Sequence, residues 1–362
     1  MIEINKLIRE FSQADMQAYL NANPTSDLQF KKFFPLKYTT DLTFEALSAD
    51  FGAKVAADVV SFDARAPRKG RPDISKIINN IPKVEIARVK NETKINTYYR
   101  LLDKVSRSSN PAIAKQLVDY IYEDTRFVDD GVNAREEWMS KQIASTGKGV
   151  LSMVNNEAGV ATVVPIDFGI PSANFVNAGI DYTTGTTHDP IADIKALQTA
   201  AKAKGFNLMY ATLDQSTFDL VAKSASLQKE AAGYFGAALN MLTTPTLDTV
   251  NQVMRAKGLP QFRVWESYVT IESKAGALTV DSGWQYGNIS FTVSPTFGDT
   301  QWTDTAESYI DFDASVKAQR DFVLVKAFAN QDPIEVVTKG VAYATPVLQG
   351  ANGIYILKTK LS

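Results

Sequence analysis

The sequence contains no cysteine and only one histidine, His188. Without cysteine, the chain can form no disulfide, Cys-ligated zinc site, iron–sulfur cluster or thiol nucleophile. A Ser–His–Asp triad would have to use His188, and a histidine-based metal site is close to excluded. His188 directly precedes the helix start Asp189-Pro190 without a Gly-x-Ser-x-Gly motif, so we interpret it as a loop residue beside a cap. No catalytic, cofactor-binding or metal-binding residue is therefore predicted.

Long apolar runs are missing as well. No stretch reaches about 18 consecutive apolar residues, so we expect no transmembrane helix. Residues 1–6 carry an acid early and no basic region ahead of an apolar run, which argues against a signal peptide. The composition is 45% hydrophobic and 22% charged, which is typical of a globular protein, and 362 residues suffice for two or three lobes. We expect an intracellular protein.

Charge is balanced overall but unevenly distributed. The formal net charge of −2 argues against a dedicated nucleic-acid binder. Residues 61–100 hold ten Lys or Arg and four acids, whereas residues 275–316 hold six acids and no Lys or Arg. Subunits packed side by side offer one way for such blocks to neutralise each other. The residues expected at this subunit interface are Arg65, Arg68, Lys69 and Arg71 on the basic side, and Asp299, Asp304 and Glu307 on the acidic side.

Hydrophobic spacing predicts an α+β chain. Helices are expected over 1–22, 110–147, 189–204, 214–230 and 245–257, and strands over 150–154, 160–165, 206–211, 262–271, 322–328, 334–344 and 354–357. The long helix begins at Asn110-Pro111, which supply an N-cap and a proline suited to the first turn, and ends near Gly147. Residues 27–46 are interpreted as an extended arm whose aromatic side chains anchor it to a core.

A basic hairpin is predicted after the arm. Residues 55–62 and 83–89 alternate as strands do, and the turn-rich segment 66–73 lies between them. Such a hairpin has little core of its own, so we expect it to be mobile or docked onto another surface. Its basic tip could bind phosphate, but it lacks interleaved aromatic residues, and a solvated or subunit-contacting loop is the commoner meaning.

The long helix carries a run of acids: Asp119, Glu123, Asp124, Asp129, Asp130, Glu136 and Glu137. Asp119 and Glu123 stand one turn apart on the same face, so a cation bound through oxygen ligands is conceivable. A solvated acidic face is the commoner meaning of such a run.

Four stretches, taken in order, resemble one known family. They are Phe33-Phe34-Pro35 with the hairpin at 55–95; Gly147-Lys148-Gly149 through Pro165-Ile166-Asp167-Phe168-Gly169 behind the long helix; Asp189-Pro190-x-x-Asp193-Ile194; and Ala344-Thr345-Pro346-Val347-Leu348. In this order they resemble the major capsid protein E family of lambda-like phages, which has the Hong Kong 97-type capsid fold. The resemblance spans residues 30–358.

The resemblance implies a structural protein without enzymatic activity or cofactor. Copies of it would form hexamers and pentamers of an icosahedral virion shell around double-stranded DNA, assembled in the host cytoplasm. Portal and scaffold proteins, and in some cases decoration proteins, would be its partners, with non-specific proximity to DNA and no membrane contact. The acidic helix face at 119–137 would look toward the packaged DNA.

The resemblance also implies a division of the chain. Residues 1–50 would form an N-terminal arm, 51–98 the E-loop, 99–184 with 321–362 a peripheral domain around a long spine helix, and 185–320 an axial domain. Two alternatives stay open: a soluble α+β hydrolase that uses His188, and an encapsulin-like compartment shell protein.

Overall fold

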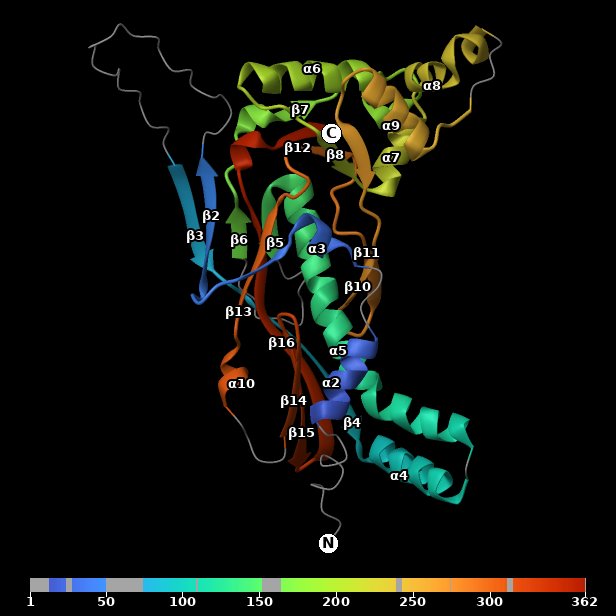
Figure 1. The fold of residues 1–362 in the computed structure, drawn as a ribbon, viewed down its shortest axis with the longest axis vertical. Helices are drawn as coiled ribbons and strands as arrows, with labels where there is room; N and C mark the ends of the chain where they lie inside the picture. The colour runs from blue at the N-terminus through green and yellow to red at the C-terminus, as the bar shows by residue number, and fades with distance from the viewer. Residues whose placement is uncertain are drawn as a thin grey trace, which may run out of the picture.

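The computed structural model describes residues 13–23, 28–49, 74–108, 110–151, 164–238, 243–273, 275–310 and 315–361. This part of the chain contains helices and strands in runs of each kind rather than in strict alternation, which agrees with the predicted α+β class. The molecule is elongated, with a smaller sheet and its helices at one end and a larger sheet at the other (Figure 1). Helix α5 (Pro111–Thr146) runs along the long axis between them (Figure 1).

The smaller sheet has five strands in the order β7-β17-β12-β8-β9. They are β7 (Phe175–Asn177), β17 (Tyr355–Lys358), β12 (Asn288–Thr292), β8 (Tyr210–Leu213) and β9 (Gln261–Val264). Helices α6 (Pro190–Ala203), α7 (Gln215–Ala222), α8 (Ala225–Ala238) and α9 (Leu247–Ala256) lie around this sheet (Figure 1). The core between them includes Leu197, Phe262 and Tyr355.

The larger sheet is built on β16 (Ile334–Leu348). Its other strands are β1 (Leu36–Tyr38), β13 (Gly298–Thr303), β15 (Val323–Gln331), β14 (Ser315–Arg320) and β4 (Lys83–Asn91). The first part of β16 pairs with β15 on one edge and β4 on the other, and its last part pairs with β13. A second core, which includes Val132, Phe322 and Val325, fills the space between this sheet and α5.

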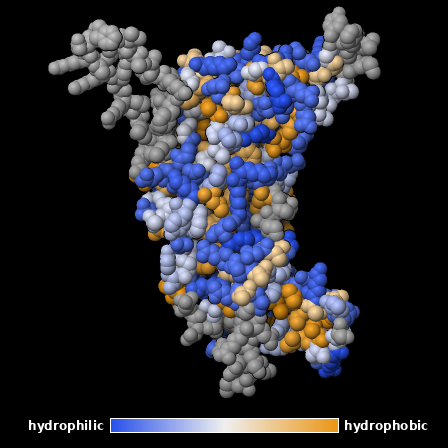
Figure 2. Space-filling model, in the orientation of Figure 1, coloured by the Kyte–Doolittle hydropathy of each residue, from blue (hydrophilic) through white to orange (hydrophobic). Residues whose placement is uncertain are grey.

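Helix α5 has the ends that the sequence predicts. The Asn110 side chain accepts a hydrogen bond from the backbone N–H of Ala112 (2.9 Å), and Pro111 occupies the first helical turn. At the other end Gly147 adopts a left-handed conformation (φ 71°) and donates its N–H to the carbonyl of Ile143 (2.8 Å). Beside its N-terminal half lies α4 (Glu92–Arg107), an amphipathic helix that was not predicted from the sequence. Hydrophobic residues gather on the surface in the region of α4 and the start of α5 (Figure 2).

Several predicted elements need correction. The strand predicted within 83–89 exists, but as β4 it pairs with β16, not with residues 55–62, which lie outside the described residues. The hairpin instead pairs β2 (Thr43–Ala49) with β3 (Ile74–Asn80). The helix predicted over 214–230 is two helices that separate at Ser224, whose buried hydroxyl donates to the carbonyl of His188 (2.7 Å). The strand predicted over 262–271 is likewise two strands, β9 and β10 (Val269–Glu272).

Candidate assembly surfaces

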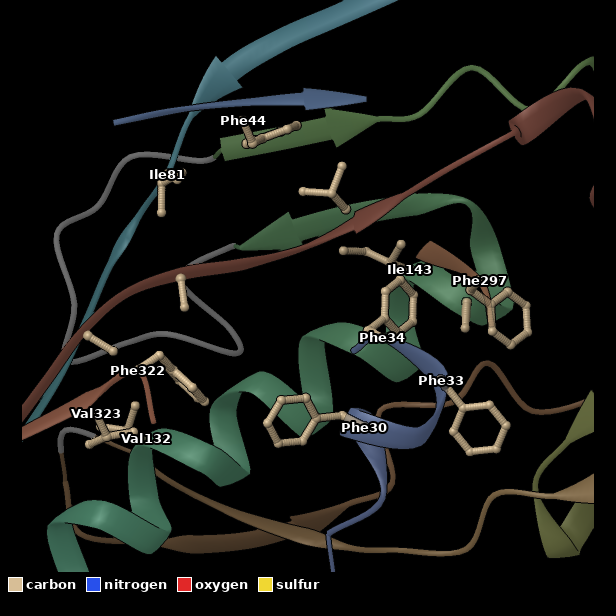
Figure 3. Packing of buried hydrophobic residues seen from close by; sticks show 14 of the residues in the cluster. Phe30, Phe33, Phe34, Phe44, Ile81, Val132, Ile143, Phe297, Phe322 and Val323 are labelled. Atoms are coloured by element: carbon tan, nitrogen blue, oxygen red, sulfur yellow. The ribbon is translucent and has the colours of Figure 1, made fainter. Parts of the chain in front are cut away.

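The N-terminal arm is held to the body by aromatic side chains, as predicted. Phe30 and Phe33 belong to the short helix α3 (Phe30–Phe33), and both are buried together with Phe34 (Figure 3). The Phe33 ring stacks on Trp265 with 4.1 Å between centroids, and the Phe34 ring stacks on Phe297 at 5.9 Å. Beyond these anchors the chain continues as β1 and β2 over the flank of the molecule (Figure 1).

The β2–β3 hairpin lies on one flank and has two unlike faces. Phe44 and Ala46 are buried on its inner face, where the Phe44 ring meets Phe168 with 6.1 Å between centroids. On the outer face Ile78 is 55% exposed. Leu42 directly precedes β2, on the same side of the strand as Phe44, and it is also 59% exposed. The hairpin thus presents large apolar side chains to solvent.

A second two-stranded unit lies on the other side of α5. It pairs β10 with β11 (Leu278–Asp281). Val269 packs against Trp138 and Met139 of α5, and the Trp138 Nε1 donates to Asp281 Oδ2 (2.8 Å). The opposite face of this unit carries Leu278 and Val280, which are 68% and 66% exposed.

The predicted interface residues divide into two groups. The basic residues Arg65, Arg68, Lys69 and Arg71 lie outside the described residues. Of the acidic residues, Asp299 lies on β13, 3.8 Å from Lys37 Nζ, and Asp304 accepts hydrogen bonds from the hydroxyls of Tyr38 (2.9 Å) and Tyr309 (3.1 Å). Both β13 and α10 (Ala306–Tyr309) lie on the same side of α5 as the β2–β3 hairpin (Figure 1).

Glu307 is surrounded by lysines of its own chain. Its carboxylate lies 2.8 Å from Lys339 Nζ, 3.8 Å from Lys83 Nζ and 3.9 Å from Lys326 Nζ. Burial disfavours the charge of the neighbouring Glu85, but hydrogen bonds from Lys83 and Lys339 outweigh that effect and lower its pKa. Because Lys83 belongs to the basic block and Glu307 to the acidic block, the two blocks already meet in part within one protomer.

The prediction of a solvated acidic face on α5 is wrong for four of the seven acids. Asp124, Asp129, Glu136 and Glu137 are buried, and only Asp119 and Glu123 are exposed. The same four acids cannot face packaged DNA. Sequence alone did not show this burial, because the compensating groups come from distant parts of the chain.

Three of the buried acids have such partners. Asp124 pairs with Lys90 of β4, and Asp129 pairs with Arg320 of β14. Glu137 accepts hydrogen bonds from the backbone N–H groups of Gln29 (2.8 Å) and Phe30 (2.6 Å), from Trp265 Nε1 (2.5 Å) and from the Ser267 hydroxyl. Glu137 therefore holds the arm against α5 through charge-assisted hydrogen bonds. Its role is structural, whereas the sequence had predicted a solvated side chain.

Glu136 is different. It is fully buried, and neither of its carboxylate oxygens has a hydrogen-bond partner among the described residues. Burial raises the pKa of Glu136 to about 8, against the opposing charge of Arg135. The side chain is therefore held in the protonated form at neutral pH.

His188 is buried, whereas a catalytic base has to reach its substrate. Its ring stacks on Tyr182 with 4.2 Å between centroids, and its Nε2 lies 2.9 Å from the carbonyl oxygen of Leu220. Over the described ranges no group of three or more His, Cys, Asp or Glu side chains is placed to hold a metal ion. In the same part of the chain, no helix combines the length and the apolar character needed to cross a membrane.

Comparison with known proteins gives one family and a set of related folds. Residues 12–276 match the family model described as phage major capsid protein E. A putative capsid protein of a prophage of E. coli CFT073 superposes with a TM-score of 0.55 at 13% identity, over 96% of this chain and 99% of that one. A phage-related protein of Bordetella bronchiseptica RB50 gives a TM-score of 0.52 at 12% identity, over 95% of each chain. No curated protein matches the sequence.

Proposed function

The chain belongs to the phage major capsid protein E family, and from this premise we propose that its copies assemble as hexamers and pentamers into an icosahedral shell around double-stranded DNA. The observation that carries the proposal is the family match over residues 12–276, supported by a fold shared with a putative prophage capsid protein. The family and the α+β capsid fold that the sequence resemblance predicted are thereby confirmed. The hydrolase and encapsulin-like alternatives find no support.

The proposal extends to the parts of the shell protein. We assign the arm to residues 1–50, the E-loop to 51–98, the peripheral domain to 99–184 with 321–362, and the axial domain to 185–320. Two apolar cores, one around the five-stranded sheet and one between the larger sheet and α5, support a division into two lobes. Because β7 and β17 belong to the five-stranded sheet, whereas β13 and β14 belong to the larger sheet, we move residues 175–177 and 355–358 to the axial side and residues 298–303 and 315–320 to the peripheral side.

The charge blocks supply a second part of the proposal. The basic segment 65–71 of one copy meets the acidic block 275–316 of a neighbour. Glu307 is already surrounded by lysines of its own protomer, so of the three predicted acids Asp299 and Asp304 are the better placed to meet a neighbour's basic segment. We also propose portal and scaffold proteins as partners, a purely structural role and assembly in the host cytoplasm, and membership of the family is what supports these three proposals.

Electron microscopy of the purified full-length protein tests the shell proposal. We expect closed particles whose abundance rises with protein concentration, since association follows mass action. A protein that stays monomeric at every concentration, with or without added scaffold protein, would contradict it.

The charge proposal has its own test. Reversing Arg68, Lys69 and Arg71 to glutamate should lower the yield of particles. Reversal of three exposed lysines, Lys195 and Lys202 on α6 and Lys223 at the end of α7, serves as the matched control and should leave the yield unchanged. Normal yield from the first triple variant would refute the charge pairing.

A further inference from the structure

We propose that the docking of the N-terminal arm on α5 is controlled by the protonation of one buried side chain, Glu136. The arm stays docked while this carboxyl group keeps its proton, and it lifts more readily once the group is ionised. The contact involves the arm helices α2 (Gln13–Ala22) and α3 and the stretch of α5 from Asp129 to Ser140, which together we call the arm contact. The inference concerns the single chain and is tested separately from the proposed shell.

One end of the arm contact is an ion pair that also binds α2. Asp129 of α5 pairs with Arg320 of β14. The Arg320 guanidinium donates two further hydrogen bonds, to the carbonyl oxygens of Leu20 (2.7 Å) and Asn23 (2.9 Å) at the end of α2. Asp129 therefore holds the end of α2 through Arg320.

The other end of the arm contact lies about two turns further along α5. Glu137 accepts hydrogen bonds from the backbone N–H groups of Gln29 (2.8 Å) and Phe30 (2.6 Å), where α3 begins. An α-helix rises about 1.5 Å per residue, so Glu137 stands about 12 Å from Asp129 along the helix axis. The arm is thus held by charged groups of α5 at two separate points.

The middle of the arm contact differs, because its polar groups have no partners. Asn133, Glu136 and Ser140 are at most 2% exposed. The side-chain oxygen of Asn133, both carboxylate oxygens of Glu136 and the hydroxyl of Ser140 make no hydrogen bond within the described part of the chain. The three residues follow each other at spacings of three and four, so they lie on one side of α5. Buried oxygen atoms without partners destabilise the state that covers them.

Arm side chains form part of the cover over this side of α5. Val132 lies one turn before Glu136 and Ile143 two turns after it, and both belong to the same apolar core as Phe30 and Phe34 of the arm. Figure 3 shows the Phe30 side chain pointing from α3 toward α5 and Phe34 beside Ile143. When the arm lifts, water therefore reaches the side of α5 that carries Glu136.

The proton on Glu136 stabilises the docked arm. Burial raises the pKa of Glu136 from 4.5 to about 8 in the docked state, with Arg135 opposing. Lifting the arm hydrates the carboxyl group and returns its pKa toward 4.5, so the lifted state releases a proton that the docked state keeps. Docking is therefore strongest below pH 4.5, and it weakens as the pH rises toward about 8.

Other titratable groups around the arm contact respond to pH as well. Burial raises the pKa of Asp129 to about 6 and lowers that of Lys141 to about 8. The remaining charged groups that face these side chains are Lys31, Asp130, Arg135, Glu137, Arg320 and Asp321. All of them are present in Glu136→Gln too, so a comparison with that variant isolates the effect of Glu136.

Thiol labelling tests the proposal, because the sequence contains no cysteine. Ser140→Cys places a thiol one turn beyond Glu136 at a fully buried position, so it reacts with methyl methanethiosulfonate only when its cover opens. The labelling rate is measured on the unassembled full-length chain, once with Glu136 and once with Glu136→Gln, over a range of pH values. The ratio of the two rates cancels the pH dependence of the thiol and of the other groups.

This ratio of labelling rates should rise with pH. A group with a pKa of about 8 in the docked state and 4.5 in the lifted state increases the population of lifted arm by about 70-fold between pH 5.5 and pH 7.5, and the rise should level off above about pH 8.5. A ratio that stays flat over this range would overturn the proposal.

Thr338→Cys separates lifting of the arm from unfolding of the whole lobe. Thr338 is buried on β16, two residues before Gly340, which closely approaches Val128 of α5, so a thiol there reports separation of α5 from the larger sheet. Ser140→Cys should be labelled at least tenfold faster than Thr338→Cys, since local opening requires less free energy than global unfolding. Equal rates at the two positions would mean that only unfolding exposes Glu136, and they would refute the proposal.

Two further variants check the arm and the carboxyl group separately. Phe30→Ala removes an arm side chain from the cover and should speed labelling at Ser140→Cys more than at Thr338→Cys; equal effects would show that the arm is not the cover. Glu136→Met also carries no proton, and it replaces Glu136→Gln in the ratio if the glutamine variant does not fold. Failure of the ratio to rise with either variant would count against control by Glu136.

Discussion

Replacing Glu136 with glutamine should remove a large part of the pH dependence of the protein's stability. Burial raises the pKa of Glu136 from 4.5 to about 8 in the folded chain, with Arg135 opposing. The unfolded chain therefore releases this proton near pH 4.5, while the folded chain keeps it until about pH 8. The free energy of unfolding consequently falls as pH rises through this window, and it recovers on acidification.

The size of the effect follows from the pKa difference. A pKa difference of one between the folded and the unfolded chain corresponds to about 1.4 kcal/mol of stability. The difference between about 8 and 4.5 therefore corresponds to about 5 kcal/mol at a pH where Glu136 is ionised in both the folded and the unfolded chain. Glutamine has similar shape and no charge at any pH. Relative to the natural protein, Glu136→Gln should therefore be more stable by about 1 kcal/mol at pH 5.5 and by about 5 kcal/mol at pH 8.5.

Urea unfolding of the unassembled chain, followed by tryptophan fluorescence at several pH values, measures this difference. Subtracting the two proteins cancels the contributions of other buried groups with shifted pKa values, such as Asp129 and Lys141. Glu123→Gln, on the exposed face of the same helix, is the control and should stay within about 0.5 kcal/mol at every pH. If the profiles of Glu136→Gln and the natural protein run parallel, Glu136 is not held protonated in the folded chain.

Three further substitutions probe the packing. Arg320→Ala leaves the buried Asp129 without its cation and should lower the free energy of urea unfolding by about 3–5 kcal/mol. Arg126→Ala, which removes an exposed ion pair with Asp130, should lower it by less than about 0.5 kcal/mol, and equal losses would show that the buried pair contributes no more than the exposed one. Phe34→Ala should cost about 3–5 kcal/mol and speed proteolytic cleavage of the arm, and an unchanged cleavage rate would argue against its role as an anchor. Gly340→Ala would place a Cβ 2.7 Å from the carbonyl oxygen of Val128, so we expect a loss of about 1–3 kcal/mol and a lower thermal midpoint; an unchanged midpoint would show that α5 and β16 can separate at little cost.

Helix α5 could be predicted almost to the residue because its ends are specified locally. Asn110, Pro111 and Gly147 act within one turn of the backbone that they cap, so a short window of sequence contains the whole signal. The anchoring role of Phe33 and Phe34 was predictable for a related reason, since large aromatic side chains in an extended segment need a surface to cover them.

The partner of β4 could not be predicted in this way. Its alternating pattern is correct for a strand, but the pattern does not say which strand completes it. The nearest candidate, residues 55–62, suggested a hairpin, whereas the structure pairs β4 with β16, more than 240 residues further along the chain. Pairing over such a separation depends on the assembled core rather than on any local signal.

The burial of acids on α5 was indicated by their spacing in the sequence, although that spacing was not used. Asp129 and Glu136 lie one or two turns from Val132 and Ile143, on the face of α5 that meets the larger sheet. That spacing was present in the sequence, but acids are so seldom buried that the run was interpreted as solvated. Arg320 comes close to Asp129 only in the folded chain, so the sequence does not show that a cation stabilises the charge of Asp129 inside the protein.

The place of β17 has a consequence for biosynthesis. This strand comes from residues 355–358, yet it lies inside the five-stranded sheet, with β7 on one edge and β12 on the other. The sheet therefore cannot close until residues 355–358 have been translated, and a nascent chain that ends before them keeps the edges of β7 and β12 unpaired. A chain truncated ahead of β17 cannot complete this lobe, so the order of synthesis makes the five-stranded sheet the later of the two sheets to close.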